Sequence, residues 1–174
     1  MKQFVTFTLN EKLYGIEILY VRELNQVAEI TPVEHAPEYI RCMINLRGQI
    51  VTIFDIGSRF GMESRECSDT TYNIILKTNS ELAAVNQNED RDDLYSSDDI
   101  AGFLVDSFGD VVEMDDDCME PPPANVSVQE KVFMSGVVKN DDLLFIVLNV
   151  NRLLSTDEEM IQEVMASRQP AHSA

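Results

Sequence analysis

The side chains best suited to acid–base or nucleophilic chemistry are two histidines, His35 and His172, and neither is placed for catalysis. Nucleophilic catalysis requires a nucleophile beside a base, and that base is most often a histidine. His35 lies between Glu34 and Ala36 in a segment expected to be a loop, and His172 lies near the end of the chain. We expect both histidines to be exposed polar residues, so the sequence offers no catalytic residue.

Phosphate and metal sites are not indicated either. The seven glycines form neither G-x-G-x-x-G nor G-x-x-x-x-G-K, the patterns that cradle phosphates. A calcium loop that began at Asp90 would have Tyr95 where an EF-hand requires glycine. The acidic run at 115–117 is consecutive, so its side chains point in different directions instead of converging. We therefore expect no cofactor and no metal.

Length and composition allow one domain, or two small ones that share a core. The chain has 174 residues, 44% of them hydrophobic, and it contains no membrane-spanning apolar run. The N-terminal residues alternate and form no apolar signal core, so we expect a cytoplasmic protein. Cys42, Cys67 and Cys118 include no C-x-x-C pair, and we expect them to be free thiols.

The net charge of -18 is concentrated in one part of the chain. Residues 81–120 contain fourteen acidic residues and one basic residue, Arg91. Such a field repels phosphate backbones and anionic lipid. We therefore expect no nucleic-acid partner and no direct membrane insertion.

Most of the chain has the residue pattern of short β-strands. Apolar side chains alternate at residues 4–9 and again at 14–18, which predicts two half-buried strands joined by a turn. Residues 49–54 are β-branched and almost continuously apolar, as expected for a strand covered on both faces. Further strands are expected at 71–76, 101–105, 111–114, 132–138 and 143–148, the last two forming a hairpin. Many short strands at close spacing favour barrels or a sandwich.

Other segments are expected to be helical or irregular. Residues 37–41 predict one helical turn begun by proline. A capping box at 156–159 predicts the start of a short amphipathic helix. Residues 79–99 are polar and acidic, and we expect a mobile loop there, most acidic over about 86–99, with room for a short helix or strand at 82–85.

A weak internal repeat is also visible. Gly15 begins an apolar strand, and a second strand follows at Met43, then a polar turn and a third strand. Gly102 begins another apolar strand, and the same succession follows from Met134. Two similar small barrels would produce this pattern, and so would chance alternation of strands and turns. The sequence leaves both readings open.

The most distinctive segment spans 42–56 and contains Asn45-Leu46-Arg47-Gly48 between two apolar strands. Glycine permits the tight turn between them. This segment resembles the N-L-R-G signature of CheW-like proteins. The resemblance runs from about Lys2 to Leu154, and it includes residues 3–7, 14–16, 21–24, 121–126, 134–137, 143–154 and, at 102–108, a match to the family's G-x-x-V-D-x-V segment.

The resemblance implies an all-β fold of two small five-stranded, SH3-like β-barrels around a shared hydrophobic core, with a short C-terminal helix. Residues 1–155 would form a single domain of two intertwined barrels, and 156–174 a short helix and flexible tail. Family members are non-catalytic adaptors of chemotaxis signal transduction. They bind the regulatory domain of a CheA-type histidine kinase and the cytoplasmic tip of methyl-accepting receptors, which docks as a helical hairpin in a groove between the barrels. Together these proteins form receptor arrays at the membrane.

The resemblance also implies binding residues. Glu23 and Arg47 match family positions that pair and shape the groove, with Val21 beside them and Leu46 and Gly48 flanking the arginine. The Glu23–Arg47 pair could equally hold two strands together, and Val21 could line the groove or the core. These alternatives stay open at the level of sequence.

The chain departs from the family pattern at three places. Cys42 replaces a glycine, Phe108 replaces a small aliphatic residue, and the acidic loop is roughly a dozen residues longer than a hairpin needs. Two other functions therefore remain as alternatives. The protein could be a diverged CheW-like scaffold that serves a different partner through its acidic loop, or a small acidic ligand-binding β-barrel protein.

Overall fold

The computed structural model describes residues 1–26, 29–66, 71–140 and 142–155, and strands are its dominant secondary structure. The strands are β1 (Lys2–Leu9), β2 (Lys12–Glu17), β3 (Val21–Asn25), β4 (Glu29–Pro32), β5 (Ile40–Leu46), β6 (Gln49–Phe54), β7 (Tyr72–Leu76), β8 (Ala101–Val105), β9 (Ser107–Met114), β10 (Met119–Glu120), β11 (Met134–Asn140) and β12 (Leu143–Leu148). The helices are α1 (Ile56–Arg59), α2 (Asn79–Asn88), α3 (Val128–Lys131) and α4 (Val150–Leu154), with 3-10 turns η1 (Ile18–Tyr20) and η2 (Asp116–Cys118).

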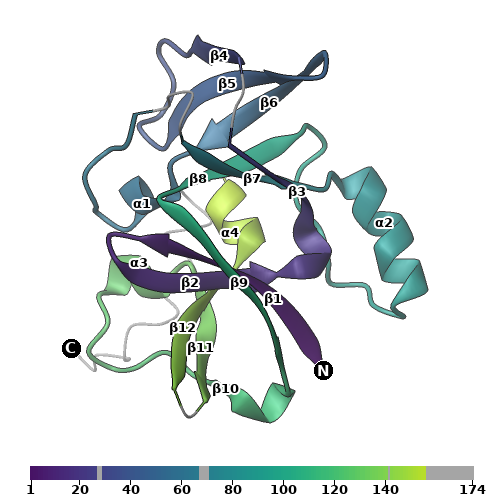
Figure 1. Cartoon of the computed structure of the whole chain (residues 1–174), viewed down its shortest axis with the longest axis vertical. Helices are drawn as coiled ribbons and strands as arrows, with labels where there is room; N and C mark the ends of the chain where they lie inside the picture. Colours follow the sequence, from purple (N-terminus) through teal and green to yellow (C-terminus); the bar gives the residue numbers. More distant parts are fainter. Residues whose placement is uncertain (27–28, 67–70, 141, 156–174) are drawn as a thin grey trace, which may run out of the picture.

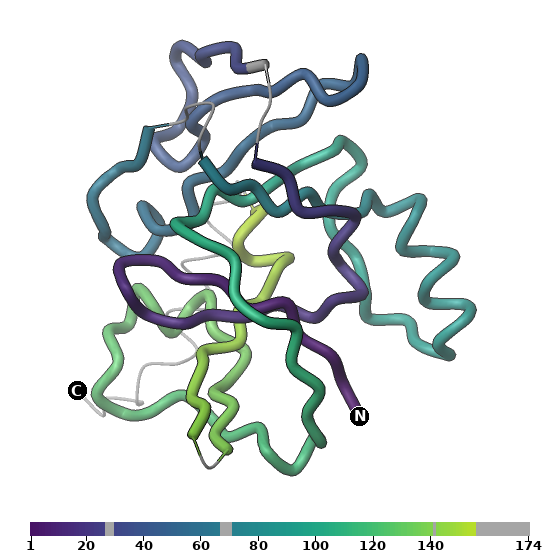
Figure 2. Tube along the Cα trace, viewed as in Figure 1, coloured from purple at the N-terminus to yellow at the C-terminus, as the bar shows by residue number. Residues whose placement is uncertain are grey.

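These strands form two sheets, which confirms the all-β fold (Figure 1). The first sheet has the order β4-β5-β6-β8-β7-β3, and the second has the order β10-β11-β12-β2-β1-β9. Each sheet contains six strands where five were expected, and in the described residues the outermost strands do not pair to close a barrel. Each sheet combines four strands of one half of the chain with two strands of the other half. Figure 2 shows the N-terminal hairpin, in purple, beside the green strands of the second half.

The internal repeat is present in the topology. The first half, β1–β6, and the second half, β7–β12, use the same sequence of antiparallel and parallel pairings. Gly15 pairs with Val147 in a parallel ladder, and Gly102 pairs with Ile53 in the equivalent ladder. The pairing of β5 with β6 corrects the alignment of the two halves, in which the sequence had placed Met43 at the position equivalent to Met134.

The hairpins of the two halves show where that alignment slips. Cys42 lies opposite Ile53, as Gly136 lies opposite Val147, and a register shift of the same kind precedes both pairs. Cys42 and Gly136 are therefore equivalent positions, and the sequence alignment was displaced by three residues. Apolar strands offer many similar registers, and only the pairing between strands selects one.

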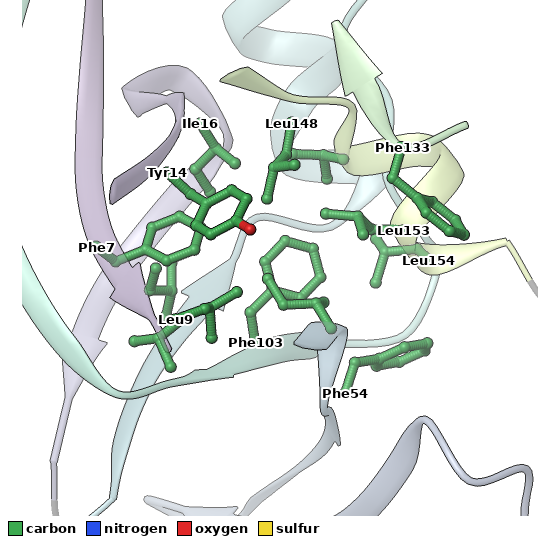
Figure 3. Packing of buried hydrophobic residues seen from close by; sticks show 14 of the residues in the cluster. Phe7, Leu9, Tyr14, Ile16, Phe54, Phe103, Phe133, Leu148, Leu153 and Leu154 are labelled. Carbon is green, nitrogen blue, oxygen red and sulfur yellow. The ribbon is translucent and has the colours of Figure 1, made fainter. Parts of the chain in front are cut away.

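The largest hydrophobic cluster lies between the two sheets and contains residues of both halves (Figure 3). Its members include Phe7, Tyr14, Ile74 and Phe103, and α4 lies among them with Leu153 fully buried. Each sheet also has a smaller cluster on its other face. β1 contacts apolar neighbours on both faces, so Phe4 and Thr6 are buried as well, and the expectation of a half-buried strand is wrong.

Two further expectations change, and a third cannot be compared with the structure. Residues 79–88 form α2, a longer helix than the short one for which 82–85 left room, because Thr78 and Glu81 make a capping box at its start. Cys118 is a free thiol as expected, whereas Cys42 is disulfide-bonded. The amphipathic helix expected after Thr156 lies outside the described residues. None of the described helices has the length and apolar character needed to cross a membrane.

Two arginines join the halves. Arg65 makes a bidentate ion pair with Asp106 after β8, and its main-chain N–H donates to Asp55 after β6. Arg59 is buried in α1 and donates to the main-chain carbonyl groups of Leu153 and Ser155 at the end of α4. Both side chains therefore connect segments that are far apart in sequence.

Candidate functional site

The turn between β5 and β6 contains the most distinctive residues of the sequence. Arg47 and Gly48 both have positive φ angles, 52° and 83°, as in the type I′ turn that matches the twist of a two-residue hairpin. The main-chain N–H of Gly48 donates to Asn45 Oδ1 at 2.9 Å. A Cβ on Gly48 would meet no atom within 4 Å, so backbone conformation and not space favours glycine here.

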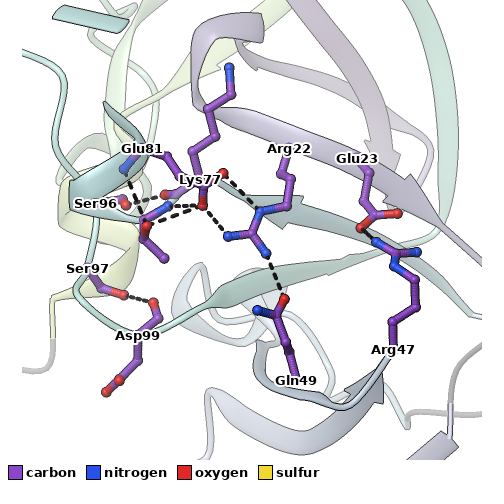
Figure 4. Close-up of polar contacts among 10 residues, drawn as sticks. Arg22, Glu23, Arg47, Gln49, Lys77, Glu81, Ser96, Ser97 and Asp99 are labelled. Atoms are coloured by element: carbon purple, nitrogen blue, oxygen red, sulfur yellow. Dashed lines mark hydrogen bonds and ion pairs between the residues drawn. The ribbon is translucent and has the colours of Figure 1, made fainter. Parts of the chain in front are cut away.

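Arg47 and Glu23 form an ion pair at the surface of the molecule (Figure 4). Arg47 Nη2 donates to Glu23 Oε1 at 2.5 Å. The arginine side chain is 70% exposed and the glutamate side chain 26% exposed. The pair therefore joins the β5–β6 turn to β3, as the sequence resemblance implied, while leaving the guanidinium accessible to a partner.

Arg22, which the sequence interpretation passed over, lies next to this pair. The ladder between β3 and β7 shifts register between Val21 and Glu23, so Arg22 occupies a β-bulge. Bulges re-aim the side chains that they carry. Arg22 Nη1 donates to Gln49 Oε1 at 3.4 Å, in the same turn that Glu23 reaches.

The other partner of Arg22 comes from α2. Arg22 Nε donates to Glu81 Oε2 at 3.2 Å, and its Nη2 atom donates to Glu81 Oε1. This hydrogen bonding to Arg22 holds the pKa of the Glu81 carboxyl below its ordinary value, with a smaller contribution from Thr78. The T-x-x-E pattern at Thr78 could have identified Glu81 as a helix-capping residue, but no local signal could have paired it with Arg22.

The remaining residues of the expected site are less accessible. Leu46 is buried in the smaller cluster of the first sheet, with Ile44 and Val51, so it fixes the base of the turn. Val21 is half-buried and packs against the large shared cluster. Glu23, Arg47 and Gly48 thus come together at the surface, whereas Leu46 lies beneath them.

Exposed apolar side chains occur at equivalent places in the two halves. Leu24 on β3 is 41% exposed, and its counterpart Val111 on β9 is 54% exposed. Ile50 on β6 is 60% exposed, and its counterpart Leu144 on β12 is 62% exposed. The repeat therefore extends to the apolar side chains that each half exposes.

The acidic segment after α2 is fixed to the body of the protein by its one base. Arg91 donates to both carboxylate oxygens of Glu17, at 2.6 and 3.1 Å, and to Asp93. A hollow of about 380 Å³ adjoins this contact, and Tyr20 and Tyr95 line it. Burial is the main cause that raises the pKa of Tyr20 to about 12. Among the described residues, no cluster of three or more His, Cys, Asp or Glu side chains could hold a metal ion.

Comparison with known proteins identifies the family. The model of the CheW-like domain matches residues 3–158. The chemotaxis protein CheW of Treponema pallidum is 28% identical over 158 residues, which cover 90% of this chain and 84% of that protein. The chemotaxis protein CheW of Klebsiella aerogenes is 24% identical over 165 residues, covering 95% and 89%.

A solved structure agrees with the sequence comparisons. The crystal structure of scaffolding protein TtCheW from Thermoanaerobacter tengcongensis superposes with a TM-score of 0.68 and 31% identity, covering 90% of this chain and 89% of that one. The match includes both sheets, since it extends over nearly the whole chain. The chain therefore belongs to the CheW-like domain family, a family of non-catalytic scaffold and adaptor proteins that act in chemotaxis.

Proposed function

We propose that this protein couples methyl-accepting chemoreceptors to a CheA-type histidine kinase as an adaptor, through binding alone. The observation that carries the proposal is the ion pair between Arg47 and Glu23, which joins an exposed, charged turn to β3. Its sequence context is the N-L-R-G signature of a family that includes chemotaxis proteins. A receptor tip would bind beside this turn, at Val21, Glu23, Leu46, Arg47 and Gly48.

The geometry of the turn suits recognition of a preformed helical hairpin. The type I′ conformation and the hydrogen bond from Gly48 to Asn45 hold the loop before any partner arrives. An interface that is ordered in advance loses less conformational entropy on binding. Arg47 would present its guanidinium to the tip, while the buried Leu46 would keep the turn in place.

The duplicated architecture supports binding of two partners at once. Leu24 and Ile50 are exposed in one half, and Val111 and Leu144 occupy the matching positions in the other. The kinase regulatory domain has a similar fold in the family that this sequence resembles. It would contact such apolar positions without competing for the Arg47 turn. Residues 1–155 would be the binding unit, located in the cytoplasm and brought to membrane arrays by its partners.

The proposal is tested by measuring two interactions with purified protein. One titration uses the regulatory domain of a CheA-type kinase from the same cell, and the other uses a receptor cytoplasmic tip presented as a helical hairpin. We expect one-to-one binding to the kinase domain with micromolar or tighter affinity, and separate binding to the tip. Absence of both interactions in folded protein would overturn the proposal and favour a diverged scaffold that uses its acidic segment.

A further inference from the structure

The internal repeat shows that one connection of the first sheet is far longer than its strands require. β1 and β2 are antiparallel neighbours joined by Asn10 and Glu11 alone. The equivalent neighbours β7 and β8 are joined by residues 77–100, which contain α2 and the acidic segment. We call residues 77–100 the insertion. Since the other half pairs the same strands without it, the insertion has a purpose other than closing the hairpin.

The insertion packs on the segment that leads into the candidate site. The main-chain N–H of Lys77 donates to the carbonyl of Tyr20 at 2.8 Å, immediately before β3. Glu81, in the first turn of α2, binds Arg22 on β3. Figure 1 shows α2 beside η1 and β3, at the edge of the molecule. The insertion is therefore attached to the strand that carries Glu23.

The repeat also shows that the arginine in the β3 bulge, Arg22, occurs only beside the insertion. The bulge in β3 has an equivalent in β9, where two residues again lie opposite one. Gly109 stands at the position of Arg22, and Asp110 at the position of Glu23. A Cβ on Gly109 would lie only 2.4 Å from Thr6 Oγ1. The sheet without an insertion thus has no cation in its bulge, whereas the sheet with the insertion has both Arg22 and its partner Glu81.

Two arginines consequently lie near Glu23 at the β5–β6 turn, Arg22 and Arg47, and only Arg47 pairs with it. Arg22 donates to Gln49 and Glu23 accepts from Arg47, so both β3 side chains reach the β5–β6 turn (Figure 4). Removal of the Glu81 charge would leave Arg22 without its carboxylate partner. The carboxylate of Glu23, the next residue in the chain, would then be available to Arg22. A bidentate carboxylate partner is the arrangement that holds a guanidinium most firmly.

We propose that Glu81 is a positioning residue for the candidate site: it holds Arg22 away from Glu23, so that Glu23 stays paired with Arg47. The insertion thereby sets the charge pattern that the β5–β6 turn presents. This inference rests on the proposed function only where receptor binding is the readout. Loss of Glu81 releases Arg22, which then competes with Arg47 for the carboxylate.

The substitution that tests this is Glu81→Gln. Glutamine can replace glutamate in a capping box, so α2 keeps its cap while the charge is lost. The partner-free readout is the pair of side-chain Nε–H signals of Arg22 and Arg47 in the nitrogen-15 spectrum. We expect both signals to move in Glu81→Gln. We expect the Arg47 signal to return to its wild-type position in the double variant Glu81→Gln/Arg22→Gln.

Receptor-tip affinity provides the second readout. Glu81→Gln should weaken binding of the tip about fivefold, a typical size for coupling between neighbouring sites. The double variant Glu81→Gln/Arg22→Gln should restore it, because the released cation is gone. If Glu81 merely supported the fold, removal of Arg22 as well would not restore binding.

Two outcomes overturn the inference. One is an Arg47 signal unmoved by Glu81→Gln, and the other is a double variant that remains as perturbed as the single one. Wild-type protein that binds no receptor tip would instead contradict the proposed function. The arginine signals would still decide whether Glu81 positions the pair, so the two failures are distinguishable.

Discussion

Gly15 and Gly102 occupy the same place in the two halves, each at the parallel contact that joins one half to the other. A Cβ on Gly15 would lie 2.9 Å from two ring carbons of Phe145. A Cβ on Gly102 would lie 2.9 Å from Ile53 Cδ1 and 3.1 Å from the carbonyl oxygen of Ile74. All of these distances are shorter than the ordinary contacts of a Cβ atom, so neither position accommodates a side chain without movement of its neighbours.

Alanine at these glycines is expected to destabilise the fold. Gly15→Ala and Gly102→Ala should each lower the free energy of unfolding by about 1–3 kcal/mol, because the added methyl group overpacks a filled core. Urea unfolding would measure the loss. Gly48→Asn is the matched control, since its position is open and asparagine tolerates positive φ. A Gly102→Ala protein as stable as wild type would contradict this account of the ladder.

Reversal of the charge at the exposed turn is expected to separate binding from stability. Arg47→Glu should abolish receptor coupling while the melting temperature changes little, because an exposed ion pair contributes about 0–1 kcal/mol. Receptor-dependent kinase activity and thermal unfolding would be measured on the same preparations. Lys139→Glu makes the same reversal beside the equivalent hairpin turn of the other half and should leave coupling intact. Unchanged coupling in folded Arg47→Glu protein would remove Arg47 from the site.

Arg65 is expected to stabilise the junction between the halves in a pH-dependent way. Its hydrogen bonds to Asp106 are the main cause that holds the pKa of this carboxyl below its ordinary value. Arg65→Met would leave Asp106 and the buried Asp55 without their cation, at a cost of roughly 3–5 kcal/mol near pH 7. Urea unfolding near neutral pH would measure this cost.

The sign of the pH dependence follows from the two carboxyl groups. The depressed pKa of Asp106 stabilises the fold above its unfolded pKa of about 3.9, and this contribution is lost as pH falls through the folded value. Burial raises the pKa of Asp55, so its contribution is present below its unfolded pKa and lost as pH rises through its folded value. The cost of Arg65→Met should therefore shrink when unfolding is repeated below pH 4, and an equal cost at both pH values would contradict the assignment.

Arg59 is expected to be the most important contact of α4. Its guanidinium carbon lies 3.9 Å from the centre of the Tyr39 ring, and its Nη2 atom donates to the carbonyl of Ser155 at 2.7 Å. Arg59→Met keeps the apolar stem but leaves buried carbonyl groups without their donor, which should cost about 2–3 kcal/mol. Chemical unfolding would test this against Lys12→Met, which removes a largely exposed cation and should cost less than about 0.5 kcal/mol.

Local sequence determined the elements of this protein more completely than their arrangement. Residues 101–105 and 143–148 form strands at the expected limits, and the Arg-Gly turn after Leu46 has the expected hairpin geometry. Periodicity and turn chemistry act over a few residues, so they can be read without knowledge of distant neighbours. The same local signal carried the family resemblance, because N-L-R-G is a contiguous motif.

Tertiary structure alone decided which strands pair and which polar groups meet. The exchange of β1–β2 and β7–β8 between the sheets gives β1 a core on both faces, and it buries Phe4 and Thr6 despite their alternating pattern. The contact between Arg22 and Glu81 joins residues from separate elements, across a bulge that no local pattern announces. Such contacts depend on long-range packing and register, because a charged side chain takes whichever partner the fold brings within reach.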